Sequence, residues 1–177
     1  LENDKIQSLY EQNINEFIVD KTGSILSSIE SSNSDNYTIY QSRENDKVTG
    51  YAIPIAGKGL WGTMYGYFAI EPDAETVKGI TFYRHKETPG LGAEVDKEWF
   101  QSNFIGKKLI DTNGSLVSVE VVKGYVSSTD PKSMHKVDGI SGATITGKGL
   151  TTFLKNDLQK YEPYLSKVRK LNQIESL

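Results

Sequence analysis

The chain has 177 residues, enough for one domain with a sizeable core or at most two small ones. Its formal net charge of −3, with 37% hydrophobic and 24% charged residues, is ordinary for a soluble globular protein and gives no support to nucleic-acid binding, which usually shows a basic stripe. It contains no cysteine, which excludes disulfides, thiolate zinc sites and iron–sulfur clusters carried by this chain.

The chain begins at Leu1 rather than methionine, and no apolar run in it is long enough to cross a membrane. We expect an upstream segment to have been removed, which fits both a cut after a membrane anchor and a mature secreted protein.

Apolar side chains near the start of the chain recur at helical spacing and predict an amphipathic helix over about residues 3–18, docked on the core. They are Ile6, Leu9, Tyr10, Ile14, Phe17 and Ile18.

A polar loop at residues 29–36 leads into a series of β-strands. Pro54 indicates a sheet edge or a strand end, because proline cannot donate a backbone hydrogen bond. Two glycines, Gly62 and Gly66, share one face of the clearest strand and leave room there for a ligand or another backbone. Alternating apolar and polar residues between turn formers predict strands at 37–41, 47–55, 59–70 and 77–84.

Residues 85–92 connect the last of these strands to a helix predicted at about 93–104. Thr88 precedes proline and is pushed toward an extended conformation, while Pro89-Gly90 suits a tight turn, type II being one form. Pattern alone favours a simple strand–turn–helix connection here over a ligand site. The helix is expected to turn three side chains inward: Val95, Trp99 and Phe100.

Two further strands are predicted at 106–112 and 116–122, joined by the strong hairpin signal Asn113-Gly114 and followed by a loop at 127–136. A final helix follows, which Pro163 is expected to end or kink. Its apolar positions are Leu150, Phe153, Leu154 and Leu158.

Hairpin-like strand neighbours predict an α+β fold, with a single domain built on a largely antiparallel sheet flanked by helices. The domain is expected to span residues 21–177, after an N-terminal helix within residues 1–20. No internal repeat or long linker divides it further.

The final helix opens at Asp138-Gly139-Ile140-Ser141-Gly142-Ala143-Thr144-Ile145-Thr146, a stretch rich in small and hydroxyl residues. Small residues let a ligand approach the backbone, and a helix start offers unpaired N–H groups and a positive dipole end, which together suit a phosphate. The competing interpretation is an ordinary helix N-cap, and the residue pattern by itself favours the cap.

The sequence gives little sign of a metal site, a hydrolase nucleophile, a catalytic carboxylate pair or a P-loop. His85 and His135 lie far apart without further evident ligands, so no metal site is predicted. Ser141 lacks both the second glycine of a nucleophile elbow and a strand directly before it. Nothing local brings Glu87 and Asp138 together as a carboxylate pair, and no P-loop is present. No catalytic residue is therefore assigned.

Three stretches, in the order of one family's motifs, carry a resemblance to proteins with covalently bound FMN. Residues 138–146 resemble the flavinylation motif D-G-x-S-G-A-T-x-T, and residues 87–92 match the box E-T-P-G-L-G. Residues 59–66 look like the strand motif G-L-W-x-x-M-Y-G, which is most similar to the C subunit of the Na+-translocating NADH:quinone oxidoreductases. The G subunit of the Rnf electron-transport complex is the related alternative.

The resemblance implies that FMN is joined through its phosphate to the hydroxyl of Thr144 by a flavin transferase. It implies a single transmembrane helix upstream of Leu1, which anchors the domain on the periplasmic side of the inner membrane. It also implies an electron-carrying subunit of a Na+-translocating NADH:ubiquinone reductase, which relays electrons between partner subunits and shows no turnover as an isolated domain.

The same resemblance suggests roles for residues around the flavin. Glu87 and Thr88 would hydrogen-bond its polar edges, and Leu91 and Trp61 would cover its ring. Lys123 would either stabilise a reduced anionic form or be a solvated charge. The other residues expected near the cofactor are Asp138, Ser141, Gly142, Ala143 and Gly92.

Two interpretations from other functional classes stand beside this one. The first is a non-redox extracellular binding domain whose opening motif is only a helix cap. The second is a soluble FMN enzyme acting alone, which would turn over a small substrate as an isolated domain.

Overall fold

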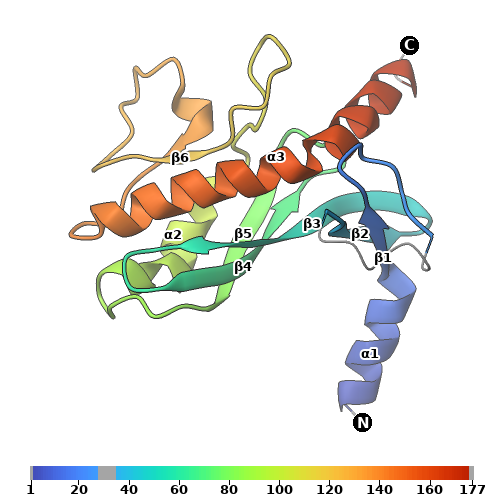
Figure 1. The fold of residues 1–177 in the computed structure, drawn as a ribbon, viewed down its shortest axis with the longest axis horizontal. Coiled ribbons are helices and arrows are strands. Elements are labelled where there is room, and N and C mark those ends of the chain that lie inside the picture. Colours follow the sequence, from blue (N-terminus) through green and yellow to red (C-terminus); the bar gives the residue numbers. More distant parts are fainter. Residues whose placement is uncertain (1, 28–34, 176–177) are drawn as a thin grey trace.

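A computed structural model describes residues 2–27 and 35–175, and its main feature is an antiparallel sheet crossed on one face by a long helix (Figure 1). The sheet is a meander in the order β1-β2-β3-β4-β5. This architecture confirms the predicted α+β fold. The main elements are β1 (Ile14–Val19), β2 (Tyr37–Glu44), β3 (Lys47–Lys58), β4 (Thr63–Ile70), β5 (Val77–Arg84) and α3 (Thr144–Glu175).

The remaining elements are short, apart from an N-terminal helix that projects away from the body of the domain (Figure 1). A second, two-stranded parallel sheet forms from β6 and β7. These elements are α1 (Glu2–Asn13), η1 (Gly92–Asp96), α2 (Glu98–Gln101), η2 (Ser102–Phe104), β6 (Glu120–Val121), η3 (Ser133–His135) and β7 (Lys136–Val137).

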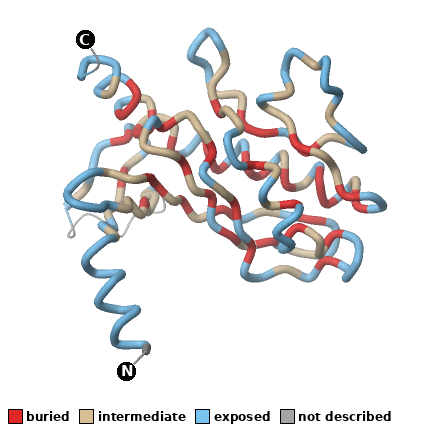
Figure 2. Tube along the Cα trace, turned by 180° about the vertical axis from the view of Figure 1, so that it is seen from behind, coloured by how far each residue is buried: buried red, intermediate tan, exposed pale blue. Residues whose placement is uncertain are grey.

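The core lies between α3 and the sheet face beneath it. In β4 the residues at 64, 66, 68 and 70 are buried and those between them are not, as the period of two predicts for a half-buried strand. Figure 2 shows the buried residues concentrated along α3 and the strands, with residues 3–13 of α1 exposed. Strand β4 begins only at Thr63, because the N–H of Gly59 donates to the carbonyl of Gly62 at 2.8 Å and closes a turn at 59–62.

The prediction of one helix over residues 3–18 is wrong in its second half. The helix ends at Asn13, and β1 pairs with β2 from Ile14 opposite Ser42 to Val19 opposite Tyr37. Apolar residues at Ile14, Phe17 and Ile18 fit helical spacing, but aromatic and β-branched side chains also favour strands, and the available partner strand decides.

The N-terminal helix is also not docked on the core. Ile6, Leu9 and Tyr10 are 64%, 50% and 41% exposed. Strand β1 belongs to the sheet, so the end of the helix does not coincide with the expected domain boundary at residue 20. Within residues 2–27 and 35–175, no helix combines the length and the apolar character needed to cross a membrane. The predicted polar loop at 29–36 falls almost entirely outside these ranges.

The predicted helix at 93–104 is instead three short pieces, because Lys97 is extended, with φ −86° and ψ 142°. Val95 and Phe100 are buried as expected, but Trp99 is 48% exposed. The Trp99 indole Nε1 donates to the carboxylate of Glu94 at 2.9 Å, which holds the ring on the surface. The prediction of an inward Trp99 was therefore wrong.

The strands predicted at 106–112 and 116–122 shrink to isolated bridges and to the two residues of β6. Ser118 has a φ of +68°, a conformation outside the β region, and it interrupts the second strand.

Pro163 does not end α3, which continues to Glu175. Gly23 packs so closely on this proline that a Cβ there would lie 2.4 Å from the Pro163 carbonyl carbon.

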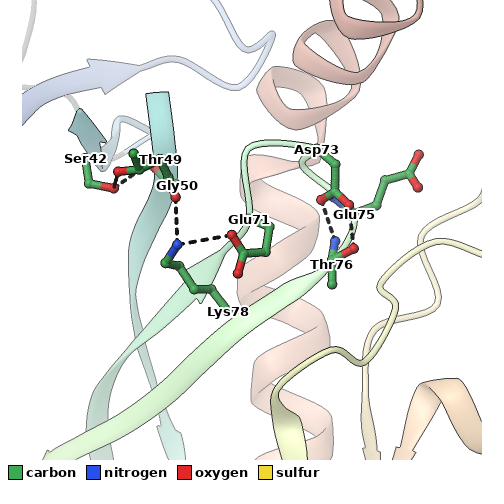
Figure 3. A network of polar contacts seen from close by, with 8 residues as sticks. All are labelled: Ser42, Thr49, Gly50, Glu71, Asp73, Glu75, Thr76 and Lys78. Carbon is green, nitrogen blue, oxygen red and sulfur yellow. Dashed lines mark hydrogen bonds and ion pairs between the residues drawn. The ribbon is translucent and has the colours of Figure 1, made fainter. Parts of the chain in front are cut away.

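The β4–β5 turn is held by the carboxylate of Asp73, which accepts backbone N–H groups of Glu75 at 2.9 Å and of Thr76 at 2.8 Å (Figure 3). The Thr76 hydroxyl donates to the same side chain. Burial raises the pKa of Asp73, but these hydrogen bonds outweigh it and keep the pKa below its usual value. The turn also contacts α3, since the guanidinium of Arg169 donates to the carbonyl of Ala74 at 3.0 Å.

Beyond Ala52, strand β3 has a neighbour on the β4 side only, because its pairing with β2 ends there. Pro54 lies in this part of β3, as its lack of an N–H predicted for an edge position. The next backbone N–H on this side of β3 belongs to Ala56, and it donates to the buried carboxylate of Asp157 in α3 at 2.8 Å. Helix α3 therefore supplies an acceptor for this one donor on the free edge of β3.

Asp157→Ala is expected to reduce the free energy of unfolding by about 1–3 kcal/mol, because the N–H of Ala56 would lose the charged carboxylate that accepts it. Lys160→Ala is the matched control, since it removes only the ion pair with Asp157 and the lysine side chain is 47% exposed. Urea denaturation of both variants checks this. Equal losses in the two variants would contradict the role of Asp157 as the acceptor for Ala56.

Candidate functional site

The three stretches singled out in the sequence meet at one end of the molecule. The first is the turn at 59–62 between β3 and β4, and the second is the loop at 85–91 between β5 and η1. The third is the approach to α3 at 138–146. In the second stretch the N–H of Leu91 donates to the carbonyl of Thr88 at 3.1 Å, and Gly90 has the positive φ of +73° that a type II turn requires.

Glu87 joins all three stretches through its carboxylate. The Thr146 hydroxyl donates to Oε2 at 2.5 Å, the N–H of Leu60 donates to Oε2 at 3.2 Å, and the N–H of Trp61 donates to Oε1 at 2.9 Å. Glu87 is only 5% exposed and Thr146 only 1%. We call these four residues the Glu87 cluster. It fixes the β3–β4 turn and the start of α3 relative to the E-T-P-G-L-G loop.

The environment of Glu87 favours its charged form. Burial raises the pKa of this carboxyl, but the hydrogen bonds from Thr146, Trp61 and Leu60 together lower it further than burial raises it. The net pKa of Glu87 lies below its ordinary value. The carboxylate therefore remains ionised at neutral pH, where it acts as an acceptor for all three donors.

Two glycines let these segments come close together. A Cβ on Gly92 would lie 2.6 Å from Oε2 of Glu87 and 2.7 Å from the hydroxyl oxygen of Thr146. A Cβ on Gly142 would lie 2.8 Å from a methyl carbon of Leu91, and Gly142 has a φ of +74°. Side chains at either position would separate the start of α3 from the loop before it.

The start of α3 presents one free hydroxyl and one occupied hydroxyl. The first bond within the helix joins the N–H of Gly147 to the carbonyl of Ala143 at 3.0 Å, which leaves the N–H groups of residues 144–146 without helical acceptors. The Thr146 hydroxyl is buried and engaged with Glu87. The Thr144 hydroxyl is partly exposed and forms no hydrogen bond with a residue in the described ranges.

A second loop lies beside this helix start. The carboxylate of Asp138 accepts the N–H of Val126 at 2.7 Å, and the N–H of Gly139 donates to the carbonyl of Gly124 at 2.7 Å. These bonds attach the loop at 122–126 to the motif and place exposed Lys123 in the same region. Asp138 thus has a positioning role in this structure, and its carboxylate forms no pair with Glu87.

A surface cleft of about 680 Å³ lies next to the helix start. Gly90 lies on one side of it, and Asp138 and Ser141 lie on the other. Two aromatic residues that the sequence analysis did not assign to the site, Trp99 and Tyr125, also line it. No regular spacing links them to the motif, because each comes from a separate segment that only the folded chain brings here.

The predicted site residues divide into three groups. Glu87, Gly92, Leu91 and Gly142 form one connected set with the β3–β4 turn, where Leu60 and Trp61 are 39% and 66% exposed. Ser141 and Asp138 border the cleft, and Ala143 is buried at the helix start. Thr88 and Lys123 are exposed at the periphery.

The residues present fit a phosphorylated aromatic cofactor. Unpaired N–H groups and the positive end of the α3 dipole favour an anion beside Thr144. Exposed apolar side chains at Leu60, Trp61 and Leu91 provide the surface that a flat ring system needs.

Comparison with known proteins agrees with this geometry. Residues 59–159 match the family model described as an FMN-binding domain. The chain is 41% identical over 135 residues to the C subunit of the Na+-translocating NADH-quinone reductase of Pseudomonas aeruginosa, covering 75% of this chain and 51% of that protein. It is 44% identical over 131 residues to the C subunit of the Chlamydia muridarum enzyme, covering 68% and 41%.

Solved structures show the same fold. The crystal structure of the C subunit of a Na+-translocating NADH-quinone reductase from Parabacteroides distasonis superposes with a TM-score of 0.80 at 32% identity, covering 92% of this chain and 83% of that one. Shewanella oneidensis NqrC gives 0.80 at 26% identity, covering 94% and 88%. The chain spans about half the length of the curated relatives it matches. It belongs to the FMN-binding domain family, together with these C subunits.

Proposed function

We propose that this chain carries FMN as a phosphoester on Thr144 and relays electrons as a subunit of a Na+-translocating NADH:quinone oxidoreductase. The observation that carries the proposal is the difference between two hydroxyls at the start of α3. Thr146 is buried and donates to Glu87, whereas Thr144 is partly exposed, has no partner in the described ranges and lies in the first turn of the helix. Of these two hydroxyls, that of Thr144 combines accessibility with the anion-binding end of α3.

Bound FMN would supply the electron-transfer chemistry, and the protein would supply position and electrostatics. The N–H groups at the start of α3 would hold the phosphate, with Ser141 and Gly142 beside it. Leu91 and Trp61 would cover the ring, and Thr88 would lie at its polar edge. Glu87 would act through the Glu87 cluster, because its carboxylate already accepts three donors of the protein.

The assembly belongs to the same proposal. A flavin transferase would attach the cofactor, and an upstream transmembrane helix would hold the domain on the periplasmic side of the inner membrane. Other components of the complex would deliver electrons and pass them toward ubiquinone. The support is the similarity to the C subunits described above, of which this chain covers about half the length.

The direct test is to produce the full-length chain with and without the flavin transferase and to measure its intact mass. We expect a mass increase equal to FMN minus water only when the transferase is present, together with a flavin absorbance that survives denaturation. An unmodified chain isolated from its native host would overturn the proposal. Steady turnover of a small substrate by the isolated domain would instead favour an FMN enzyme that acts alone.

Lys123→Ala is expected to lower the midpoint potential of the bound flavin, because a nearby positive charge favours the reduced anionic form. The side chain is exposed, so the expected shift is small, roughly 10–20 mV. Lys123→Arg is the control and should retain the wild-type potential. A spectroelectrochemical titration of the three proteins checks this, and identical potentials would show Lys123 to be a solvated charge.

A further inference from the structure

A groove of about 640 Å³ runs between the free end of β3 and the first half of α3, and it shares no lining residue with the cleft beside Ser141. We call it the β3–α3 groove. One wall is the strand from Ala56 to Gly59, and the other is a helix stripe that begins at Ile145 and ends at Lys160. These fifteen helical steps span about 22 Å, the length of roughly six or seven extended residues.

The strand wall offers a backbone acceptor. Ala56 donates its N–H to Asp157 and not to β4, and in an antiparallel strand the C=O of a residue points to the same side as its N–H. The carbonyl of Ala56 therefore points away from β4, to the side where β3 has no partner strand in the described ranges and where the groove lies. A strand-edge acceptor of this kind suits an extended peptide segment.

The charge in the groove is opposite to that of the whole chain. The chain carries −3, yet Lys58, Lys148 and Lys160 line the groove against one carboxylate, that of Asp157. Asp157 is 5% exposed and is paired with Lys160 at 2.6 Å. Lys58 and Lys148 form no ion pair within the described ranges. The groove is thus a local basic site on an acidic protein.

The groove also begins at the proposed cofactor site. Ile145 directly follows Thr144 and is 59% exposed, and Gly59 at the same end of the groove adjoins the exposed Leu60 and Trp61. A segment lying in the groove would hold its parent protein over this end of the molecule. Electron exchange with a flavin on Thr144 requires such placement, because the two redox centres must come close together.

We infer that the β3–α3 groove docks an acidic, extended segment of the redox partner that exchanges electrons with the flavin on Thr144. The inference rests on the proposed function. Lys58 and Lys148 attract the carboxylates of the segment, the carbonyl of Ala56 accepts one of its backbone N–H groups, and Ile145 contacts its apolar side chains. An anionic lipid surface is a poorer fit, because the lysines lie in a concave channel with a directional backbone acceptor.

Charge reversal in the full-length chain, assembled in its native complex, tests the electrostatic part. Lys58→Glu is expected to slow the NADH-driven reduction of the covalent flavin by roughly tenfold at low salt and to weaken the salt dependence of the rate. Lys47→Glu, at the other end of β3, makes the same charge change away from the groove and should leave the rate unchanged. Equal rates in wild type and Lys58→Glu, or equal losses in both variants, would overturn the inference.

Flavin fluorescence on a denaturing gel separates this inference from the proposed function. Lys58→Glu should retain its covalent flavin, so a slow rate with full flavin content supports the docking groove. Absence of flavin from the wild-type chain would instead refute the proposed function. Loss of flavin only in Lys58→Glu would assign Lys58 to the cofactor site and overturn its docking role.

A photo-crosslinking benzophenone amino acid at Thr152, in the middle of the helix wall, identifies the occupant in native membranes. We expect a cross-link to a carboxylate-rich segment of another protein of the complex. The same amino acid at Tyr83, which is 62% exposed on the open face of the sheet, is the control and should not cross-link to that segment. Cross-links to lipid, or to protein segments without acidic residues, would overturn the inference.

Discussion

Thr144→Ala is expected to abolish covalent attachment of FMN and to stop electron transfer through this protein, while the domain remains folded. The phosphoester needs the hydroxyl oxygen of Thr144. This hydroxyl forms no hydrogen bond within the described ranges, so its removal should not weaken the fold. Thr144→Ser keeps an oxygen at the same position and should retain part of the flavin. Denaturing-gel fluorescence and the NADH:quinone reductase activity of native membranes measure both effects.

Ser141→Ala is the matched control for Thr144→Ala, because Ser141 is an exposed hydroxyl in the same motif. We expect it to keep its covalent flavin. Thr146 is a poorer control, since its hydroxyl belongs to the Glu87 cluster. Fluorescent flavin on Thr144→Ala, or its loss from Ser141→Ala alone, would move the attachment point away from Thr144.

Glu87→Ala is expected to have the largest effect on the organisation of the site. It leaves the Thr146 hydroxyl and the N–H groups of Leu60 and Trp61 without their acceptor, which should cost about 2–4 kcal/mol of unfolding free energy. Flavin attachment should also fall, because the start of α3 would no longer be fixed to the β3–β4 turn. Urea denaturation and flavin content measure the two consequences.

The pH dependence gives an independent check on Glu87. Its pKa is lowered in the folded protein, so its contribution is fully present above the unfolded value, about 4.5, and is lost as the pH falls through the lower folded value. Glu87→Gln keeps one acceptor oxygen and cannot titrate. The stability difference between wild type and Glu87→Gln should therefore shrink as the pH falls below about 4.5. A difference independent of pH would contradict the ionised Glu87 cluster.

The sheet was largely predictable because its signals are local. Alternation in β4 and the turn formers between neighbouring strands specify hairpins, and consecutive hairpins make an antiparallel meander. Strand β5 was predicted with the bounds it has, Val77–Arg84. The secondary-structure prediction was wrong where the same apolar residues fit both a helix and a strand. Ile14–Val19 satisfies a helical pattern, but pairing with β2 makes it a strand.

Other differences between the predicted and the observed structure come from single residues, whose effect helix and strand propensities do not reveal. The positive φ of Ser118 interrupts a β-branched stretch that otherwise favours a strand. The outward Trp99 donates to a side-chain acceptor, Glu94, that lies across the helix break at Lys97. Helix α3 continues through Pro163, where Gly23, more than a hundred positions earlier in the chain, packs against its backbone.

The candidate site likewise has parts that the sequence could locate and parts that it could not. The motif at 138–146 and the loop at 87–92 could be located from sequence because each is contiguous. The bond between Thr146 and Glu87 could not, since the two residues are 59 positions apart and no periodicity links them. In the structure this bond distinguishes Thr146 from Thr144, the hydroxyl that the motif resemblance had already singled out.

The most direct measurement of the central claim is site localisation of the flavin on the full-length protein from its native membrane. Trypsin cleaves after Lys136 and Lys148, so one peptide, residues 137–148, contains all three candidate hydroxyls of the motif. Fragmentation of this peptide by tandem mass spectrometry should place the mass of FMN minus water on Thr144. An unmodified peptide, or the same mass on Ser141 or Thr146, would contradict the proposal.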